Sequence, residues 1–149
     1  MRSFPTIESV SSVALTTLRP ALYRARNAEI LSRDLDLFDH AKMVAHSSNY
    51  STKVGCVAAK STRVICAAAN KLTNPSLNVP VGEATKHAEM CVLTMLMEYA
   101  KITMYIARLG RNEALPSRPC TKCMQAIKNK GVREIVYLSK DGRVVKEMW

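Results

Sequence analysis

The sequence lacks several features that would place it in a special class of protein. No apolar run approaches the roughly 20 residues that a membrane-spanning helix needs, and there is no internal repeat or low-complexity segment. Its 149 residues are enough for one compact domain but too few for two. Aromatic residues are also few, with five Tyr, two Phe and one Trp. We therefore expect an ordinary globular protein without a membrane partner.

The cysteines do not form the pattern of a disulfide framework. Their number is odd and no clear secretory signal is present, which favours reduced thiols and a cytoplasmic location. Cys56, Cys66 and Cys91 lie in apolar runs and are expected to behave as small buried hydrophobic residues. The remaining two, Cys120 and Cys123, form a Cys-x-x-Cys pair that needs a separate explanation.

Acidic residues are scarce relative to basic ones. The chain has 22 Lys and Arg against 12 Asp and Glu, a formal charge of +10, and residues 101–149 hold 11 of the basic and 4 of the acidic groups. A basic surface favours anionic ligands such as nucleotides, nucleic acid or acidic lipid, but it does not choose among them. A solvated basic surface without any ligand explains the charge equally well.

The sequence divides into an N-terminal segment over residues 1–31 and a domain over residues 32–149. The first segment is a basic, Ser/Thr-rich arm or helix, in which residues 1–27 contain four Arg and a single acid, Glu8. This bias is typical of organelle transit peptides. A flexible arm, or a helix packed on a neighbouring subunit, is the alternative.

From residue 32 onward the hydrophobic pattern alternates between helical and strand periods. The expected elements are a helix over 32–46, hairpin strands over 54–59 and 64–69, a loop over 70–83, a helix over 86–99, a strand over 101–108, a loop over 109–118, a helix over 120–131, a strand over 134–138 and a short tail. Helices between the later strands imply crossover connections. The fold class is therefore α/β, with a mixed sheet covered by helices.

Two short motifs at the starts of two expected helices carry the chemistry. Cys120 and Cys123, at i and i+3 in a first turn, can turn both sulfurs toward one point, and a helix N-terminus lowers thiol pKa values. With His87 they make three zinc ligands, which leaves the fourth position of a tetrahedral site for water. Glu89, two residues after His87, would point near the metal without binding it and could transfer protons.

The same motifs allow a redox site, a structural metal site or a binding protein at the level of sequence. A redox-active Cys-x-x-Cys pair would leave His87 and Glu89 without a role. A structural zinc site would need a fourth ligand, for which Cys91 and His46 are candidates. A non-catalytic zinc-binding assembly protein is a further alternative, although it would have no need for Glu89.

The combined pattern His-Ala-Glu … Pro-Cys-x-x-Cys is the signature of zinc-dependent base deaminases. The chain accordingly resembles the cytidine and deoxycytidylate deaminase superfamily from about Leu35 to Leu138. The segments that carry the resemblance are VGCVAAKSTRVICAAANK, KHAEM, KITMYIAR and RPCTKCMQAIKNKGVREIVYL. The chain looks most similar to small dCMP-deaminase-like proteins.

The resemblance implies a three-layer α/β/α fold with a five-stranded mixed sheet, a bound Zn²⁺ and a homo-oligomer. It also implies that Asn70 contacts the sugar of a nucleoside and that the Ala88 amide reads the edge of the base. Arg118 precedes Pro119-Cys120 where adenosine- and guanine-directed relatives commonly have Glu, which favours a cytosine-type base. Arg118, with Arg108 and Arg111, is also a candidate contact for phosphate.

Three functions follow from these observations. The leading one is hydrolytic deamination of a free cytosine nucleotide such as dCMP. The second is deamination of cytosine or adenine bases within RNA or single-stranded DNA; the basic C-terminal third favours it, whereas the scarcity of aromatic residues for base stacking opposes it. The third is the non-catalytic zinc-binding protein on the same fold.

Overall fold

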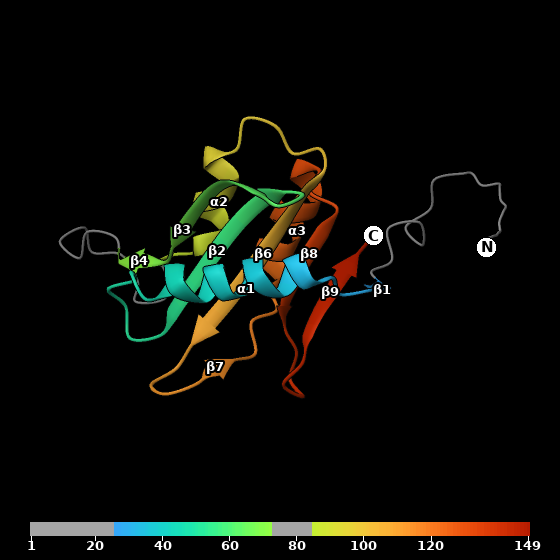
Figure 1. Ribbon diagram of the computed structural model, residues 1–149. Coiled ribbons are helices and arrows are strands. Elements are labelled where there is room, and N and C mark those ends of the chain that lie inside the picture. The colour runs from blue at the N-terminus through green and yellow to red at the C-terminus, as the bar shows by residue number, and fades with distance from the viewer. Residues whose placement is uncertain (1–25, 73–84) are drawn as a thin grey trace, which may run out of the picture.

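A computed structural model describes residues 26–72 and 85–149 (Figure 1). The elements are, in order, β1 (Arg26–Ala28), α1 (Ser32–Ala45), β2 (Lys53–Lys60), β3 (Arg63–Ala69), β4 (Lys71–Leu72), β5 (Thr85–Lys86), α2 (Ala88–Met95), β6 (Ile102–Leu109), β7 (Ala114–Leu115), α3 (Thr121–Lys130), β8 (Glu134–Leu138) and β9 (Val144–Met148). None of the described helices is long and apolar enough to cross a membrane.

The described strands form one large mixed sheet and one small antiparallel pair. The order in the large sheet is β1-β9-β8-β6-β2-β3, and β7 pairs with β6. β6 and β8 are parallel, as their crossover through α3 requires, and the other pairs are antiparallel. β4 pairs with β5 outside this sheet.

The expectation of five strands is corrected to seven in the large sheet. Five long strands (β2, β3, β6, β8 and β9) form its body. β1 and β7 add three and two residues to it. Such short edge strands carry no alternating hydrophobic pattern, so nothing in the sequence announces them.

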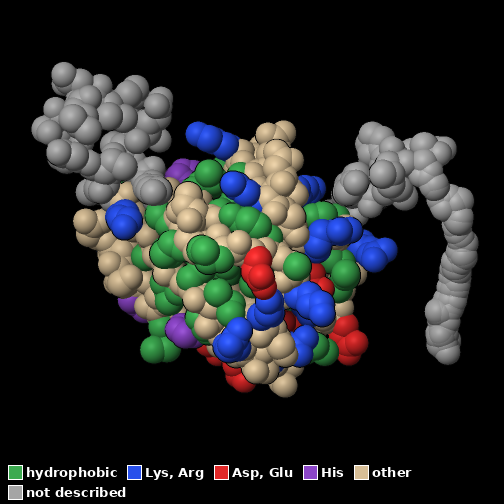
Figure 2. Space-filling model, turned by 90° about the horizontal axis from the view of Figure 1, so that it is seen from above, with side chains coloured by type: hydrophobic (Ala, Val, Ile, Leu, Met, Phe, Trp, Pro, Cys, Tyr) green, Lys and Arg blue, Asp and Glu red, His purple; other side chains and the backbone are tan. Residues whose placement is uncertain are grey.

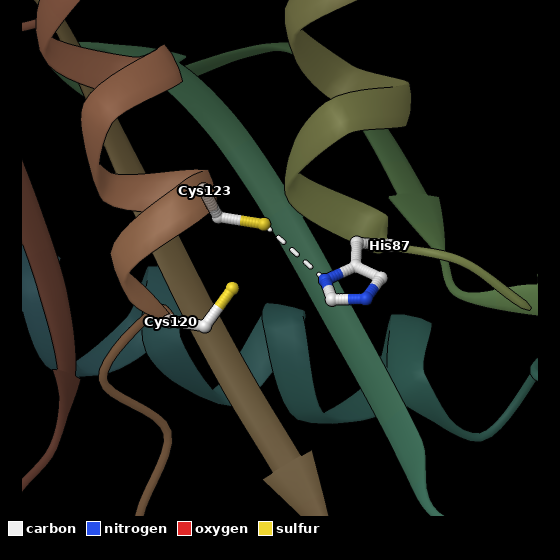
Figure 3. Close-up of side chains that lie close together, drawn as sticks. All are labelled: His87, Cys120 and Cys123. Carbon is white, nitrogen blue, oxygen red and sulfur yellow. Dashed lines mark hydrogen bonds between the residues drawn. The ribbon is translucent and has the colours of Figure 1, made fainter. Parts of the chain in front are cut away.

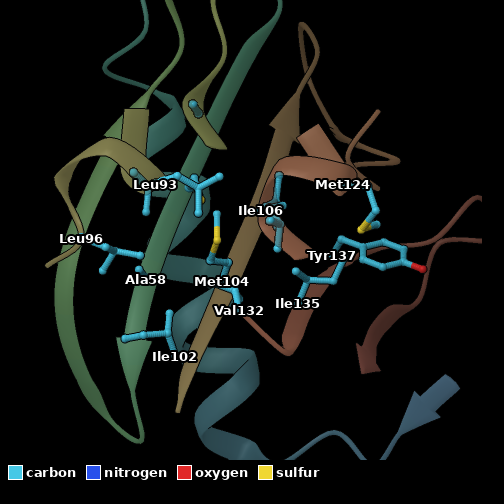
Figure 4. Close-up of a cluster of buried hydrophobic side chains, with 14 of the residues drawn as sticks. Ala58, Leu93, Leu96, Ile102, Met104, Ile106, Met124, Val132, Ile135 and Tyr137 are labelled. Atoms are coloured by element: carbon cyan, nitrogen blue, oxygen red, sulfur yellow. The ribbon is translucent and has the colours of Figure 1, made fainter. Parts of the chain in front are cut away.

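Helices cover both faces of the sheet and give it three layers, with α1 on one face and α2 and α3 on the other (Figure 1). Alternation along the strands produces two cores. In β6, for example, Met104 and Ile106 face α2 and α3, whereas Tyr105 and Ala107 face α1. Figure 4 shows the larger core, in which side chains of β6 and β8 pack against side chains of α2 and α3. The predicted α/β/α fold is confirmed.

The backbone of α1 packs directly against β2 at a glycine, Gly55. A Cβ atom on Gly55 would lie 2.2 Å from the Ala41 carbonyl oxygen and 2.5 Å from the Ala45 nitrogen. Ala41 and Ala45 are themselves fully buried. Three small residues thus set the distance between α1 and β2, the strand that leads into the site described below.

Two elements differ from the sequence-based expectation. The helix expected over 86–99 is shorter, because Leu96 has extended backbone (ψ 134°) and turns into the core. The Tyr99 hydroxyl donates to the Leu93 carbonyl at 2.9 Å, which satisfies one of the carbonyls freed at the helix end. The expected C-terminal tail instead contains β9, which pairs with β8 along its whole length.

The other predicted elements are present with boundaries shifted by a few residues. The loop expected over 70–83 falls mostly outside the described residues, as do residues 1–25 of the N-terminal segment, so its reading as a transit peptide, an arm or a helix stays open. Residues 26–28 of that segment form β1 on the edge of the sheet, antiparallel to β9. The division at residue 32 stays a prediction.

Candidate metal centre and active site

Two of the three expected metal ligands are the residues at which α2 and α3 begin. His87 and Cys120 occupy the N-cap positions, with extended backbone, and neither side chain makes a capping hydrogen bond. N-caps are usually Ser, Thr, Asp or Asn, whose side chains bond to the free N–H groups of the first turn. The two helices here give up that stabilisation, and both side chains point into the space between the helix ends (Figure 3).

The third ligand, Cys123, lies one turn into α3 and completes a compact group. The Nδ1 atom of His87 lies 3.3 Å from Cys123 Sγ, and the ligand atoms of His87, Cys120 and Cys123 all lie within 4.8 Å of one another. Zinc bonds of about 2.0 Å to nitrogen and about 2.3 Å to sulfur separate tetrahedral ligand atoms by about 3.5 to 3.8 Å. The group therefore fits a zinc ion with little adjustment.

The ionisation of Cys123 differs from what the sequence suggested. A position in the first turn of a helix was expected to lower thiol pKa values. Burial, together with the neighbouring Glu89 and Cys120, instead raises the pKa of Cys123 above its ordinary value. Because a cation beside a thiol favours the thiolate, the metal itself would have to supply the charge that ionises this ligand.

Among the described residues that line the adjoining space, Glu89 is the one acidic side chain. It lies in the first turn of α2 and only 6% of its surface is exposed. Burial raises the pKa of Glu89, against the opposing effects of a backbone hydrogen bond and of His87. A carboxyl group in such surroundings can hold and release a proton nearer to neutral pH than an exposed one.

A cavity of about 400 Å³ opens beside the metal ligands. It contains the three residues predicted to contact substrate, Asn70, Ala88 and Arg118, and also Arg108. Arg111, by contrast, is exposed and does not line it. The remaining lining residues are Tyr50, Thr52, Val54, His87, Glu89, Ile106, Pro116, Ser117 and Cys120.

Asn70 has a structural role in the wall of this cavity. Its Oδ1 atom accepts a hydrogen bond from the Val54 N–H at 2.9 Å, and its Nδ2 group donates to the Thr52 carbonyl at 2.9 Å. A side-chain amide has two N–H groups and two acceptor lone pairs. Asn70 therefore holds the start of β2, and these two bonds to described residues use one of its donors and one of its acceptors.

Arg118 is held by a residue that sequence reasoning missed. Its Nε and Nη2 groups donate to the two oxygens of Glu147 at 3.0 and 2.9 Å. Tyr137 donates to the same carboxylate at 2.7 Å. Glu147 comes from the segment expected to be a tail, and no local motif marks it, because only the pairing of β9 with β8 brings it to Arg118.

The fourth ligand of a closed structural zinc site is not found among the described residues. Neither Cys91 nor His46 belongs to the group formed by His87, Cys120 and Cys123. Cys91 faces a different cavity, between β3 and α2. The three-ligand arrangement is the one that leaves a position open for chemistry.

A His-Cys-Cys metal centre beside a buried glutamate, at the starts of two helices, defines the class of zinc-dependent hydrolytic deaminases. Residues 31–139 match the sequence profile of the cytidine and deoxycytidylate deaminase zinc-binding region. The chain belongs to this family. The predictions of family and of zinc as cofactor are confirmed. A comparison with curated protein sequences found no match.

A solved structure supports the fold. The cytidine deaminase from Burkholderia pseudomallei matches with a TM-score of 0.53 and 21% sequence identity, over 74% of this chain and 89% of that one. At this identity the likeness concerns the fold alone. It agrees with the three layers and the mixed sheet described above.

Proposed function

We propose that this protein deaminates a free cytosine nucleotide of the dCMP type, giving the uracil nucleotide and ammonia. The observation that carries the proposal is the composition of one cavity. Two of the metal ligands, His87 and Cys120, line it with Glu89, and so do two basic residues, Arg108 and Arg118. The first set suits hydrolysis of an exocyclic amine, and the second suits an anionic substrate.

The chain's own residues divide the reaction between binding and proton transfer. His87, Cys120 and Cys123 would hold the zinc ion, which when bound supplies Lewis-acid activation of water. Glu89 takes a proton from the attacking water and delivers protons to the ring nitrogen N3 and to the departing amine. The C4–N bond breaks, oxygen replaces nitrogen at C4, and ammonia leaves.

Recognition of the base and sugar is assigned to two residues of the cavity wall. Ala88 is the first residue of α2, where a backbone N–H has no acceptor within the helix. We assign this amide to the edge of the base. We assign the Asn70 side chain, which lines the cavity, to the sugar.

The test is ammonia release from a panel of substrates by the zinc-loaded protein. The panel contains deoxycytidine, dCMP, the corresponding adenine compounds and a short single-stranded oligonucleotide, and dCMP is expected to give the highest kcat/KM. A preference for the oligonucleotide, with a steep dependence of binding on salt, would favour a polynucleotide substrate instead. Absence of ammonia from every cytosine compound would overturn the proposal.

The role of Glu89 is tested by Glu89→Gln, which keeps the shape of the side chain. Loss of a positioned general acid and base lowers kcat by about 10²- to 10⁴-fold, while bound zinc should stay at one ion per chain. Glu98→Gln is the matched control, because Glu98 is exposed and pairs with Lys60 away from the cavity. Full activity of Glu89→Gln would contradict the mechanism.

A homo-oligomer and a cytoplasmic location complete the proposal. Several large apolar side chains are exposed, among them Met43 at 71% and Met97 at 95%. Figure 2 shows hydrophobic side chains in the middle of one face of the molecule, with Lys and Arg side chains beside them. Such surfaces favour contact with another subunit. Light scattering of the zinc-loaded protein gives its mass, and a monomer at all concentrations would contradict the assembly.

A further inference from the structure

The guanidinium group of Arg118 is fixed in one orientation at the edge of the cavity. Both oxygens of Glu147 accept hydrogen bonds from it, at 3.0 Å from Nε and 2.9 Å from Nη2. Paired bonds of this kind set the plane of the guanidinium as well as its position. The Arg118 side chain is 51% exposed, whereas that of Glu147 is 6% exposed. The carboxylate is therefore the buried, immobile partner of the pair.

Glu147 is itself fixed by Tyr137, whose hydroxyl donates to Glu147 Oε1 at 2.7 Å. Burial raises the pKa of Glu147, but the hydrogen bonds from Arg118 and Tyr137 outweigh burial and hold this pKa below its ordinary value. The carboxylate is thus charged at neutral pH. Tyr137, Glu147 and Arg118 form a chain of contacts from β8 through β9 to the residue before Pro119.

Stability alone does not account for this arrangement. A buried ion pair rarely stabilises a protein more than apolar residues of the same volume, and half of the Arg118 side chain faces solvent. Glu147 occupies the Nε–Nη2 edge of the guanidinium. No hydrogen bond from Nη1 to a described residue is found, and the adjacent edge, formed by Nη1 and the second N–H of Nη2, can bind an anion in the same paired manner.

The cavity around Arg118 suits such an anion. Arg108 lines the same cavity from β6, and Glu89 is the only acidic side chain among the described lining residues. The charge of Arg118 is balanced by Glu147, so what this residue offers an anion is a set of oriented N–H donors, and Arg108 adds a second guanidinium group. A phosphate group, with several acceptor oxygens, matches this donor set.

We propose that Glu147 and Tyr137 position Arg118 to receive the phosphate group of the substrate and thereby set the preference for nucleotide over nucleoside. The inference rests on the proposed function and names the residues responsible for its substrate class. Arg118 contacts substrate, whereas Glu147 and Tyr137 are positioning residues that act through it.

The test compares dCMP with deoxycytidine in variants of these residues. Because a hydrogen-bonded charge pair is worth about 10- to 100-fold in binding, Arg118→Ala should lower kcat/KM for dCMP by that factor, mainly through KM. The value for deoxycytidine should change by less than about twofold. Glu147→Gln and Tyr137→Phe should also lower the ratio of kcat/KM for dCMP to kcat/KM for deoxycytidine, by smaller factors.

A double variant separates positioning from a general effect on the fold. If Glu147 acts through Arg118, the substrate ratio of Arg118→Ala/Glu147→Gln should equal that of Arg118→Ala alone. Equal losses for dCMP and deoxycytidine in Glu147→Gln would overturn the positioning role. Arg143→Ala is the matched control, since Arg143 also pairs with a carboxylate, that of Asp141, but on an exposed turn outside the cavity.

Binding of the products gives a readout that does not depend on catalysis. Titration calorimetry should show tighter binding of dUMP than of deoxyuridine by the zinc-loaded protein, and Arg118→Ala should abolish the difference. If Glu147→Gln does not fold, Arg118→Lys and Tyr137→Phe carry the test, because the first retains the charge but loses the paired geometry.

The outcomes distinguish this inference from the proposed function. An unmodified protein that deaminates deoxycytidine as well as dCMP would contradict the nucleotide substrate, and this inference with it. A protein that prefers dCMP while Arg118→Ala keeps the preference would overturn the inference and leave the proposed function standing.

Discussion

The ammonium group of Lys146 lies 2.8 Å from the carboxylate of Asp34, and both side chains are buried. Asp34 also accepts hydrogen bonds from the Tyr105 hydroxyl at 2.7 Å and from the Leu31 N–H at 2.9 Å. This network joins the start of α1 to β6 and β9. The sheet thus holds α1 by a charged contact as well as by the close packing of Gly55 against Ala41 and Ala45.

Removal of one partner should destabilise the protein strongly. Lys146→Met keeps most of the side-chain volume but leaves the Asp34 carboxylate buried without its cation, which costs about 3 to 5 kcal/mol. Chemical denaturation of the zinc-loaded protein measures this loss. The double variant Asp34→Asn/Lys146→Met should be more stable than Lys146→Met, because no uncompensated charge remains. A double variant less stable than the single one would contradict this explanation.

The same pair predicts a loss of stability in acid. Burial alone would raise the pKa of Asp34, but hydrogen bonds from Lys146, Leu31 and Tyr105 outweigh it, and the pKa lies below its ordinary value of 3.8. Such a carboxylate stabilises the folded state above the unfolded pKa, and the contribution is lost as pH falls through the folded pKa. The free energy of unfolding should therefore decrease below about pH 5.

The variant Asp34→Asn should flatten part of this decrease, at the expense of stability at neutral pH. The control is Asp36→Asn, which removes the same charge from an exposed position of the same helix. Denaturation curves between pH 7 and pH 3 compare the two variants. An equal dependence on pH in both would show that the buried pair is not its source.

A single methyl group at Gly55 should separate α1 from the sheet. The added Cβ would lie 2.2 Å from the Ala41 carbonyl oxygen, which is backbone and cannot move aside alone. Overpacking of this kind costs about 1 to 3 kcal/mol, so the melting temperature of Gly55→Ala should fall. Gly142→Ala is the comparison, since it has open space but a positive φ of 86°. A smaller loss in Gly55→Ala than in Gly142→Ala would argue against close packing here.

The metal centre could be predicted from sequence because its information is local. His87 and Glu89 are two residues apart, Cys120 and Cys123 three apart, and each pair spans the N-cap and first turn of one helix. The three-layer fold was predictable for a related reason, since the hydrophobic period changes from helix to strand along the chain.

The partner that holds Arg118 could not be predicted, because it depends on pairing between distant segments. Glu147 meets Arg118 only because β9 pairs with β8, and the five residues of β9 contain polar as well as apolar side chains on both faces. The end of α2 escaped prediction for a different reason. Its apolar sequence continues through Met97, which is 95% exposed, so only tertiary packing shows where the helix stops.

Loss of any one metal ligand should remove zinc as well as activity. Cys123→Ser replaces a soft thiolate by a hydroxyl, and zinc affinity should fall by more than the roughly 100-fold that loss of an outer hydrogen-bond partner can cost. Zinc per chain after dialysis is the measurement. The control is Cys66→Ser, which removes a thiol of β3 outside the ligand group. This variant should keep one zinc ion per chain. Activity removed by a chelator should return with Zn²⁺ and not with Mg²⁺.

The side chain of Asn70 should act in two ways that a change of substrate can separate. Asn70→Ala removes the hydrogen bonds to Thr52 and Val54, and unpaired backbone groups cost about 1 to 3 kcal/mol each when buried. This loss of support at the cavity wall should raise KM for every substrate.

If Asn70 also contacts the sugar, the unmodified protein should prefer dCMP over its 3′-deoxy analogue, and Asn70→Ala should lose that preference. Asn112→Ala, at an exposed turn, is the control. An unchanged preference in Asn70→Ala would limit the residue to holding β2 in place.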